Sequence, residues 1–289
     1  KSDLAVALAR ALTPAEIVNA DSMQLYRGMD IGTAKLAEDE RGGIPHHLVD
    51  ILDIEETASV AVFQRAAREV ISACHGRGVL PIVVGGSALY VRAVVDRFDF
   101  PGTDPKVRAR FEAELERVGP VELHGRLARL DPEAASRILP TNGRRIVRAL
   151  EVIELTGRPF TASLPERGEY AFHDVVQIGL EVPRDVLDRR IEERVDRMWD
   201  AGFVDEVRRL EAAGLRKGVT ASRALGYAQI LSYLAKECSE AEAREATVRA
   251  TRRFARRQDS WFRKDPRIRW LPYDSPTLLE DAVAIARTQ

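Results

Sequence analysis

The sequence predicts an α/β fold, a parallel sheet with helices on both faces, plus an inserted all-helical subdomain. Helical and strand patterns alternate through the first third of the chain. The segment Leu80–Val84 is almost wholly apolar, as expected of a parallel strand that is buried on both faces. The alternation stops after Phe100, where helical patterns continue without a convincing strand.

The core elements follow from the spacing of apolar residues. Leu4, Leu8 and Leu12 recur at helical spacing until Pro14 ends the helix. The elements expected next are a strand over 16–20, a helix over 59–75, a strand over 80–84 and a helix over 87–95. This order of elements is typical of a doubly wound sheet.

The loop FPGTDP opens the helical insertion, which we place at 104–169, so that the core comprises 1–103 and 170–289. The core elements expected after the insertion are a strand over 175–180, helices over 185–213 and 222–236, a basic helix that ends near 264, and an edge strand over 269–271. Ser239 and Glu242 have the spacing of a capping box that opens the basic helix.

The composition is that of a soluble protein of a reducing cytoplasm. The 289 residues include only two cysteines, and no apolar run approaches the roughly 18 residues that a membrane helix needs. No secretory signal pattern opens the chain. The net charge is −1, but residues 244–269 hold ten Arg or Lys against three Asp or Glu. Such a basic stripe can bind a polyanion even in a protein of neutral net charge.

Lys1 and Ser2 directly precede the first helix. A Lys-Ser pair in this place is what remains of a P-loop when its glycines and preceding strand are absent. In an intact loop of this kind, the helix N-terminus and the lysine bind phosphates, and the hydroxyl binds Mg²⁺. We therefore expect a P-loop nucleoside-triphosphatase-like core, a chain that is N-terminally truncated within the phosphate-binding loop, and Mg²⁺ on Ser2.

Two further groups follow strands of the predicted sheet. Asp21 comes after the strand over 16–20, and Gly85, Gly86 and Ser87 come after the strand over 80–84. Ligands of open α/β sheets collect at the carboxyl ends of strands. Asp21 could ligate Mg²⁺, accept a proton from a substrate, or cap a turn. The two glycines permit close approach of a ligand, and Ser87 could cap its helix as well as bind a substrate.

Arg223 is the third polar candidate outside the basic stripe. An arginine near a diphosphate would supply the planar fork of donors that suits phosphate oxygens. The adjacent His46 and His47 resemble half of a metal site, but no third ligand has suitable spacing, so we interpret them as a structural pair.

Six blocks of the sequence resemble the bacterial tRNA dimethylallyltransferases, in family order across nearly the whole chain. The blocks are NADSMQLYRGMDIGTAK (19–35), PHHLVDI (45–51), VVGGSALYVRAV (83–94), RRIVRALEV (144–152), SRALGYAQ (222–229) and ATRRFARRQDSWFR (250–263). The resemblance implies transfer of a dimethylallyl group from dimethylallyl diphosphate to N6 of adenosine 37 beside the tRNA anticodon. We further expect a monomer with no membrane partner.

Carried over residue by residue, the resemblance makes Lys1, Ser2 and Arg223 diphosphate ligands and Asp21, Ser87 and Arg223 catalytic residues, with Asp21 as the general base. Ser87 stands where the family usually has threonine. The residues implied to contact the tRNA anticodon stem-loop are Asp21, Ser22, Met23, Gln24, Ser87, Arg108, Arg144, Arg145, Ile146, Val147, Arg148, Arg252, Arg253, Arg256, Arg257 and Gln258.

Three alternatives remain open from the residues. A P-loop kinase of nucleosides or small metabolites shares the core but has no need of basic helices. An adenylate prenyltransferase would use free AMP, against which the basic residues argue. An RNA-binding protein that has lost catalytic activity would not need Asp21, Ser87 and Arg223 together.

Overall fold

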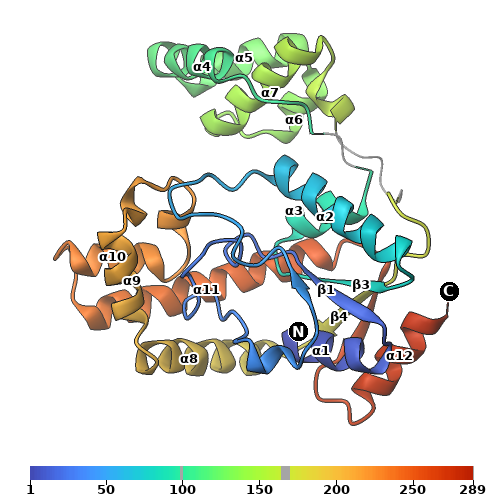
Figure 1. The fold of residues 1–289 in the computed structure, drawn as a ribbon. Helices are drawn as coiled ribbons and strands as arrows, with labels where there is room; N and C mark the ends of the chain where they lie inside the picture. Colours follow the sequence, from blue (N-terminus) through green and yellow to red (C-terminus); the bar gives the residue numbers. More distant parts are fainter. Residues whose placement is uncertain (98–99, 164–169, 289) are drawn as a thin grey trace. The chain divides into compact units, whose positions relative to one another are not determined.

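A computed structural model describes residues 1–97, 100–163 and 170–288. The chain divides into two compact units (Figure 1): unit 1 comprises 1–94 and 174–289, and unit 2 comprises 95–173. Unit 2 extends beyond the predicted insertion at both ends. No helix among the described residues is both long enough and apolar enough to span a membrane.

Unit 1 contains two parallel sheets among its described residues. The first has the strand order β2-β1-β3, and the second pairs β4 with β5. The bounds are β1 Ala15–Asn19, β2 His46–His47, β3 Leu80–Val84, β4 Gln177–Glu181 and β5 Ile268–Pro272. The four predicted strands are confirmed to within two residues, whereas the two-histidine strand β2 was not predicted.

Helices cover both faces of β1, all five residues of which are buried. The helices are α1 (Ser2–Ala11) and α2 (Val60–Gly76), and both pack against β1. Ala15 and Ile17 lie in one apolar cluster with α1. Because side chains alternate along a strand, Glu16 points to the other face, where it contacts Cys74 of α2 and Arg77, the residue that follows this helix. The predicted two-sided covering of the sheet is therefore confirmed.

The remaining helices of unit 1 differ from the prediction at two glycines. The predicted helix over 185–213 is interrupted at Gly202, which has a φ of 91°, and the predicted helix over 222–236 is interrupted at Gly226, which has a φ of 85°. A left-handed conformation is accessible to glycine and breaks the helical path. The helices are α3 Ala88–Val95, α8 Arg184–Asp200, α9 Phe203–Ala212, α10 Tyr227–Leu234, α11 Glu240–Phe262 and α12 Leu278–Arg287, with short 3₁₀ turns η1 Asp39–Arg41, η3 Leu215–Lys217 and η4 Ala221–Arg223.

Two of these helices bear directly on the prediction. The capping box of α11 is confirmed: Ser239 Oγ accepts from the backbone N–H of Glu242, and the Glu242 carboxylate accepts from the N–H of Ser239. Helix α12 was not predicted from the sequence. Figure 1 shows α11 as the long helix of unit 1, and it packs against both α8 and α10.

Unit 2 is helical among its described residues, apart from one isolated bridge between Asp96 and Tyr170. Its elements are α4 Pro105–Val118, α5 Pro120–Leu130, α6 Pro132–Arg137, α7 Gly143–Thr156 and the 3₁₀ turn η2 Phe160–Ser163. Asp104 and Asp131 cap helices that begin with proline, a residue suited to the first helical position. The core of the unit contains Phe111 and Leu127.

Glu16 links three elements of unit 1 at the start of β1. Arg77 donates to both carboxylate oxygens, at 2.9 and 2.7 Å, and His47 Nε2 lies 2.7 Å from Oε2. Hydrogen bonds from Arg77, and then from His47, lower the pKa of Glu16 from 4.5 to about 2, although burial opposes the shift. His46 Nδ1 bonds the carbonyl of Ile44 at 2.8 Å, so both histidines have structural partners.

We predict that Glu16→Gln destabilises the protein less at acidic pH than at neutral pH. A carboxyl whose pKa is lowered by folding stabilises the fold above its unfolded pKa of about 4.5 and loses that contribution as the pH falls toward about 2. Urea titrations at several pH values measure the free energy of unfolding. The difference in free energy of unfolding between the wild type and E16Q should be constant above about pH 5.5 and should shrink below about pH 4.5.

The matched control is Asp53→Asn, which breaks an exposed ion pair with Arg27. We expect it to change the free energy of unfolding by less than about 0.5 kcal/mol. A deficit of E16Q that does not vary with pH would contradict the prediction.

Candidate active site at the strand ends

The site begins where β1 and β3 end together. These strands pair in parallel from Ala15 opposite Leu80 to Asn19 opposite Val84, and the pairing continues one residue further, because Ala20 N–H donates to the carbonyl of Val84 at 2.7 Å. The sequence placed Asp21 and the 85–87 turn at one edge of the sheet. This part of the prediction agrees with the observed register.

Gly85 lies against the end of β1. A Cβ atom at this position would be 2.5 Å from the carbonyl oxygen of Ala20 and 2.7 Å from its Cβ atom. Real Cβ atoms do not approach backbone this closely, so only glycine fits without a shift of the strand end. The turn that leads to Ser87 is thereby packed directly beside the residue that precedes Asp21.

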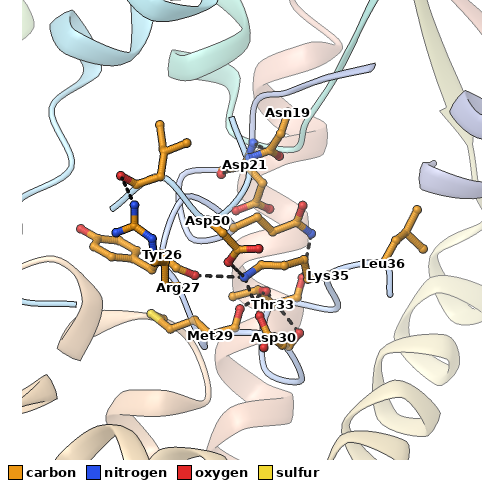
Figure 2. A network of polar contacts seen from close by, with 12 residues as sticks. Asn19, Asp21, Tyr26, Arg27, Met29, Asp30, Thr33, Lys35, Leu36 and Asp50 are labelled. Atoms are coloured by element: carbon orange, nitrogen blue, oxygen red, sulfur yellow. Dashed lines mark hydrogen bonds and ion pairs between the residues drawn. The ribbon is translucent and has the colours of Figure 1, made fainter. Parts of the chain in front are cut away.

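Asp21 is held by local hydrogen bonds (Figure 2). Its N–H donates to Asn19 Oδ1 at 2.9 Å, and its own Oδ1 accepts from the N–H of Met23 at 2.9 Å. Asn19 is buried and also donates to the carbonyl of Leu48 at 2.8 Å. The turn-capping role considered from the sequence is therefore real. It occupies one carboxylate oxygen and leaves the partly buried group its second oxygen for chemistry.

Lys1 meets the 85–87 turn from another element. It is the N-cap residue of α1 and makes no side-chain capping bond. A Cβ atom on Gly86 would lie 3.1 Å from Lys1 Nζ and 2.5 Å from Nε2 of Gln258, which donates to the Gly86 carbonyl. The ammonium group and the Gln258 amide thus both lie beside Gly86, although the three residues come from separate parts of the sequence.

Lys1, Arg190 and Arg194 are exposed residues, and their positive charges act on one another in addition to the larger effect of burial on Lys1 and Arg194. Burial lowers the pKa of the Lys1 ammonium, Asp21 raises it, and the positive charge of Arg194 lowers it further. The pKa of Arg194 is itself lowered, first by burial and then by Arg197, with a smaller effect of Arg190. Like charges gathered at one place weaken the protonated forms of all of them. This arrangement favours a bound polyanion.

Sequence reasoning missed Arg190 and Arg194. The two lie one helical turn apart on α8, which places them on one face of that helix. The available signal was their spacing relative to the buried residues Ile191 and Val195. That periodicity defines the apolar face of α8, and Arg190 and Arg194 each directly precede one of its buried residues.

Ser87 and Arg223 have distinct positions in unit 1. The Ser87 carbonyl accepts from the N–H of Val91 at 3.0 Å, so this residue begins α3 as a helix cap does. Arg223 ends η4 and is exposed. No contact among the described residues joins its side chain to Lys1, Asp21 or Ser87. Its neighbours Ala221 and Ala224 belong to an apolar cluster with Tyr26 and Met29, which relates η4 to the segment after Asp21.

The basic residues of α11 fall into two groups. Arg252 donates to Glu192 at 2.8 Å, and Arg256 lies 3.8 Å from Asp188, so both are paired with acidic residues of α8. Arg253 and Arg257 are exposed to solvent, as is Arg256, but neither Arg253 nor Arg257 forms an ion pair among the described residues. The latter pair is accordingly better placed to receive a phosphate than the former. Of the predicted segment 21–24, Ser22, Met23 and Gln24 are all partly buried.

In unit 2, the predicted tRNA residues differ in exposure. Arg144 and Arg145 are exposed, but Ile146 and Val147 are 0% and 3% exposed and belong to the core of the unit. The expectation that Ile146 and Val147 contact tRNA stays a prediction, and with buried side chains such a contact would have to be made by their backbone. Ile146 and Val147 follow the two exposed arginines directly in the sequence because α7 is amphipathic, so that neighbouring residues lie on its polar and apolar faces.

Arg108 and Arg148 bind the same buried carboxylate. Their guanidinium groups donate to Glu151 Oε2, at 2.6 and 2.9 Å, and Glu151 is 0% exposed. Burial raises the pKa of Glu151, but the hydrogen bonds from the two arginines outweigh burial and lower it. Both arginines thus have a structural role, while their side chains remain 39% and 26% exposed.

Among residues 1–97, 100–163 and 170–288, one group of three or more acidic, histidine or cysteine side chains is close enough to share a metal ion. The group consists of Glu16, His47 and Cys74. Arg77 already occupies both oxygens of that carboxylate, which disfavours a cation there. Near Lys1, the Ser2 hydroxyl and the Asp21 carboxylate are hard oxygen donors of the kind that Mg²⁺ prefers.

The family model described as IPP transferase matches residues 24–265. The chain belongs to the IPP transferase family. It is 68% identical to the tRNA dimethylallyltransferase of Thermobifida fusca, over 99% of this chain and 90% of that protein. It is also 68% identical to the enzyme of the same name from Streptomyces coelicolor, over 94% of this chain and 86% of that one.

Two solved structures are similar to this chain. The full-length tRNA isopentenylpyrophosphate transferase of Bacillus halodurans matches with a TM-score of 0.71 and 39% identity, over 98% of this chain and 90% of that one. A eukaryotic dimethylallyltransferase acting on tRNA matches with a TM-score of 0.84 and 26% identity, over 99% of this chain and 75% of that one. The family has a P-loop-like fold, as the sequence predicted.

We predict that Gly85→Ala destabilises this family member by about 1–3 kcal/mol, because the new methyl group forces the backbone of Ala20 to move. Gly76→Ala is the matched control, since a Cβ atom on Gly76 meets open space. Urea unfolding of both variants measures the difference. Equal free energies of unfolding for the two variants would contradict the packing described here.

Proposed function

We propose that this chain transfers the dimethylallyl group of dimethylallyl diphosphate to N6 of adenosine 37 in tRNA and releases diphosphate. One observation carries the proposal: cations gather at the N-terminus of α1, beside the carboxylate of Asp21. A diphosphate would relieve the repulsion among the cations. A neutral amine next to Asp21 would have a proton acceptor at hand. Membership of the family supports the same reaction.

The leaving group determines the role of the cations. The bond between the allylic carbon and the diphosphate oxygen breaks, and the electron pair leaves with that oxygen. Lys1, Arg190 and Arg194 would stabilise this negative charge, together with the N–H groups that open α1. Ser2 would hold Mg²⁺ against the diphosphate, where the ion would neutralise charge on the phosphate oxygens. Arg223 would bind the same group from η4.

Asp21 would act on the nucleophile. The exocyclic nitrogen of adenine forms the new bond to the allylic carbon and must lose one proton. The Asp21 carboxylate would take that proton through the oxygen that the Met23 N–H leaves free. Positioned proton transfer of this kind contributes about a hundredfold or more to a rate. Ser87, at the start of α3, would orient the reacting groups.

Recognition of tRNA would be shared between the two units. The target base must leave its stack, and contacts with phosphates must offset that cost of a few kcal/mol. In unit 1, the exposed Arg253 and Arg257 of α11 would supply such contacts; in unit 2, Arg144 and Arg145 of α7 would do so.

Both cysteines are free thiols, which supports the cytoplasm as the compartment of the reaction.

The test is incubation of the purified protein with Mg²⁺, labelled dimethylallyl diphosphate and unmodified tRNA, with free AMP and ATP in parallel reactions. Label should enter tRNA and should be located at adenosine 37 by nucleoside analysis. Equal labelling of AMP would indicate an adenylate prenyltransferase instead. Phosphoryl transfer from ATP without any prenylation would indicate a kinase.

We predict that Asp21→Asn lowers kcat for tRNA by about a hundredfold or more. The amide keeps the oxygen that accepts the Met23 N–H, but it cannot take a proton. Binding of tRNA, measured by filter retention, should stay within about twofold. Turnover near the wild-type level would remove Asp21 from the role of general base.

We predict that Arg194→Gln raises KM for dimethylallyl diphosphate by about tenfold to a hundredfold, because one charge-assisted hydrogen bond contributes about 1.5–3 kcal/mol. Arg189→Gln is the control on the same helix, since it removes another exposed positive charge. Arg189 lies 3.8 Å from Asp185, whereas the charge of Arg194 acts on Lys1. Steady-state kinetics at saturating tRNA measure both variants. A similar rise in both would show that the helix charge as a whole, rather than Arg194, determines the affinity.

A further inference from the structure

Lys35 is a buried cation with a full set of partners (Figure 2). Its side chain is 5% exposed, and its ammonium donates to the carbonyl of Tyr26 at 3.0 Å, to Asp30 Oδ1 at 2.6 Å and to Asp50 Oδ1 at 2.5 Å. An ammonium has three N–H donors, and all three are used. Burying a cation costs several kcal/mol unless such partners offset it.

These partners belong to two chain segments that Lys35 ties together. Tyr26 follows the predicted tRNA segment 21–24, and Asp50 follows β2. The two segments also pair through their backbones, because Asp50 N–H donates to the Gln24 carbonyl at 3.2 Å and Ile51 N–H donates to the Leu25 carbonyl at 2.8 Å. Lys35 adds the charged contact that closes the loop between β1 and β2 onto this pairing.

Gln24 depends on the same loop closure. Its side-chain Nε2 donates to the carbonyl of Thr33 at 3.1 Å and lies 3.5 Å from that of Ala34. These are the two residues before Lys35. The contacts of the Lys35 ammonium hold the backbone of the two preceding residues in place. The carbonyl groups of those residues bind the Gln24 Nε2 and so orient the Gln24 amide, which leaves its oxygen for a partner.

The rest of the loop has other anchors. Glu206 of α9 accepts from the N–H groups of Asp30 and Ile31 at 3.1 and 2.8 Å, and Tyr26 and Met29 lie in the apolar core. Without the Lys35 charge, the loop would therefore stay bound to Glu206 and to the apolar core, whereas the segment around Gln24 would lose its fixed position. Within the described part of the chain, no hydrogen bond or ion pair joins Lys35 to Lys1 or Arg194.

We infer that Lys35 is a positioning residue that fixes the tRNA-contacting segment Asp21–Gln24 through its contacts with Tyr26, Asp30 and Asp50. The inference rests on the proposed function, because tRNA is the ligand of that segment. Lys35 itself does not touch substrate. It acts on tRNA binding and not on binding of the diphosphate, and this separation distinguishes a positioning role from general stabilisation.

The test compares Lys35→Met, Asp50→Asn and the control Lys217→Met in the tRNA prenylation assay. Lys217→Met removes one positive charge from an exposed pair with Glu55. Lys35→Met should raise KM for tRNA by about tenfold and leave KM for dimethylallyl diphosphate within about twofold. The control should change neither KM. Circular dichroism and urea unfolding check that each variant is folded.

Asp50→Asn keeps Lys35 paired with Asp30, and it is the variant that tests the inference if Lys35→Met does not fold. It should raise KM for tRNA by about threefold, because the positioning contact is weakened. A fall in that KM would show that the carboxylate merely repels RNA, and would overturn the inference. Equal rises in both KM values would also overturn it. Absence of transfer by the wild-type protein would instead contradict the proposed function.

Discussion

The parallel pairing of β1 with β3 is the constraint on which the site depends. It carries Asp21 and the 85–87 turn to one edge of the sheet. The dimensions of α1 bring Lys1 to the same edge. Ten helical residues span about 15 Å, and five strand residues span about 16 Å. A helix that runs back along β1 therefore begins where that strand ends, so the start of α1 and the Asp21 carboxylate lie at the same edge of the sheet.

The sequence predicted this edge because strand ends can be recognised in a sequence. An apolar run followed by a polar or glycine residue defines both the strand and the residue that leaves it, as for Asp21 and Gly85. Arg194 is different, since its proximity to Lys1 results from the packing of α8, which no local pattern encodes. The break at Gly202 was missed for a related reason: apolar periodicity continues on both sides of the glycine, and only its φ of 91° shows that the helix ends.

Buried charges, rather than regular secondary structure, hold the loop between β1 and β2. Glu206 is 2% exposed, accepts hydrogen bonds from backbone N–H groups of this loop, and accepts a hydrogen bond from the Tyr227 hydroxyl at 2.6 Å. Burial, and then the charge of Glu206, raise the pKa of Tyr227, so the phenol stays a donor. A loop with few ladder hydrogen bonds needs such fixed acceptors, because its N–H groups would otherwise be buried without partners.

Phe203 extends this coupling to the segment that carries Arg223. A Cβ atom on Gly32 would lie 2.2 Å from the Phe203 ring, and one on Gly226 would lie 2.5 Å from it. Gly32 belongs to the loop that follows Asp21, whereas Gly226 follows Arg223 by three residues. Both chain segments therefore rest on one aromatic ring, and a side chain at either glycine would push that segment away. The fold thus relates the carboxylate segment to the arginine segment through packing, although no hydrogen bond joins the two side chains in the described residues.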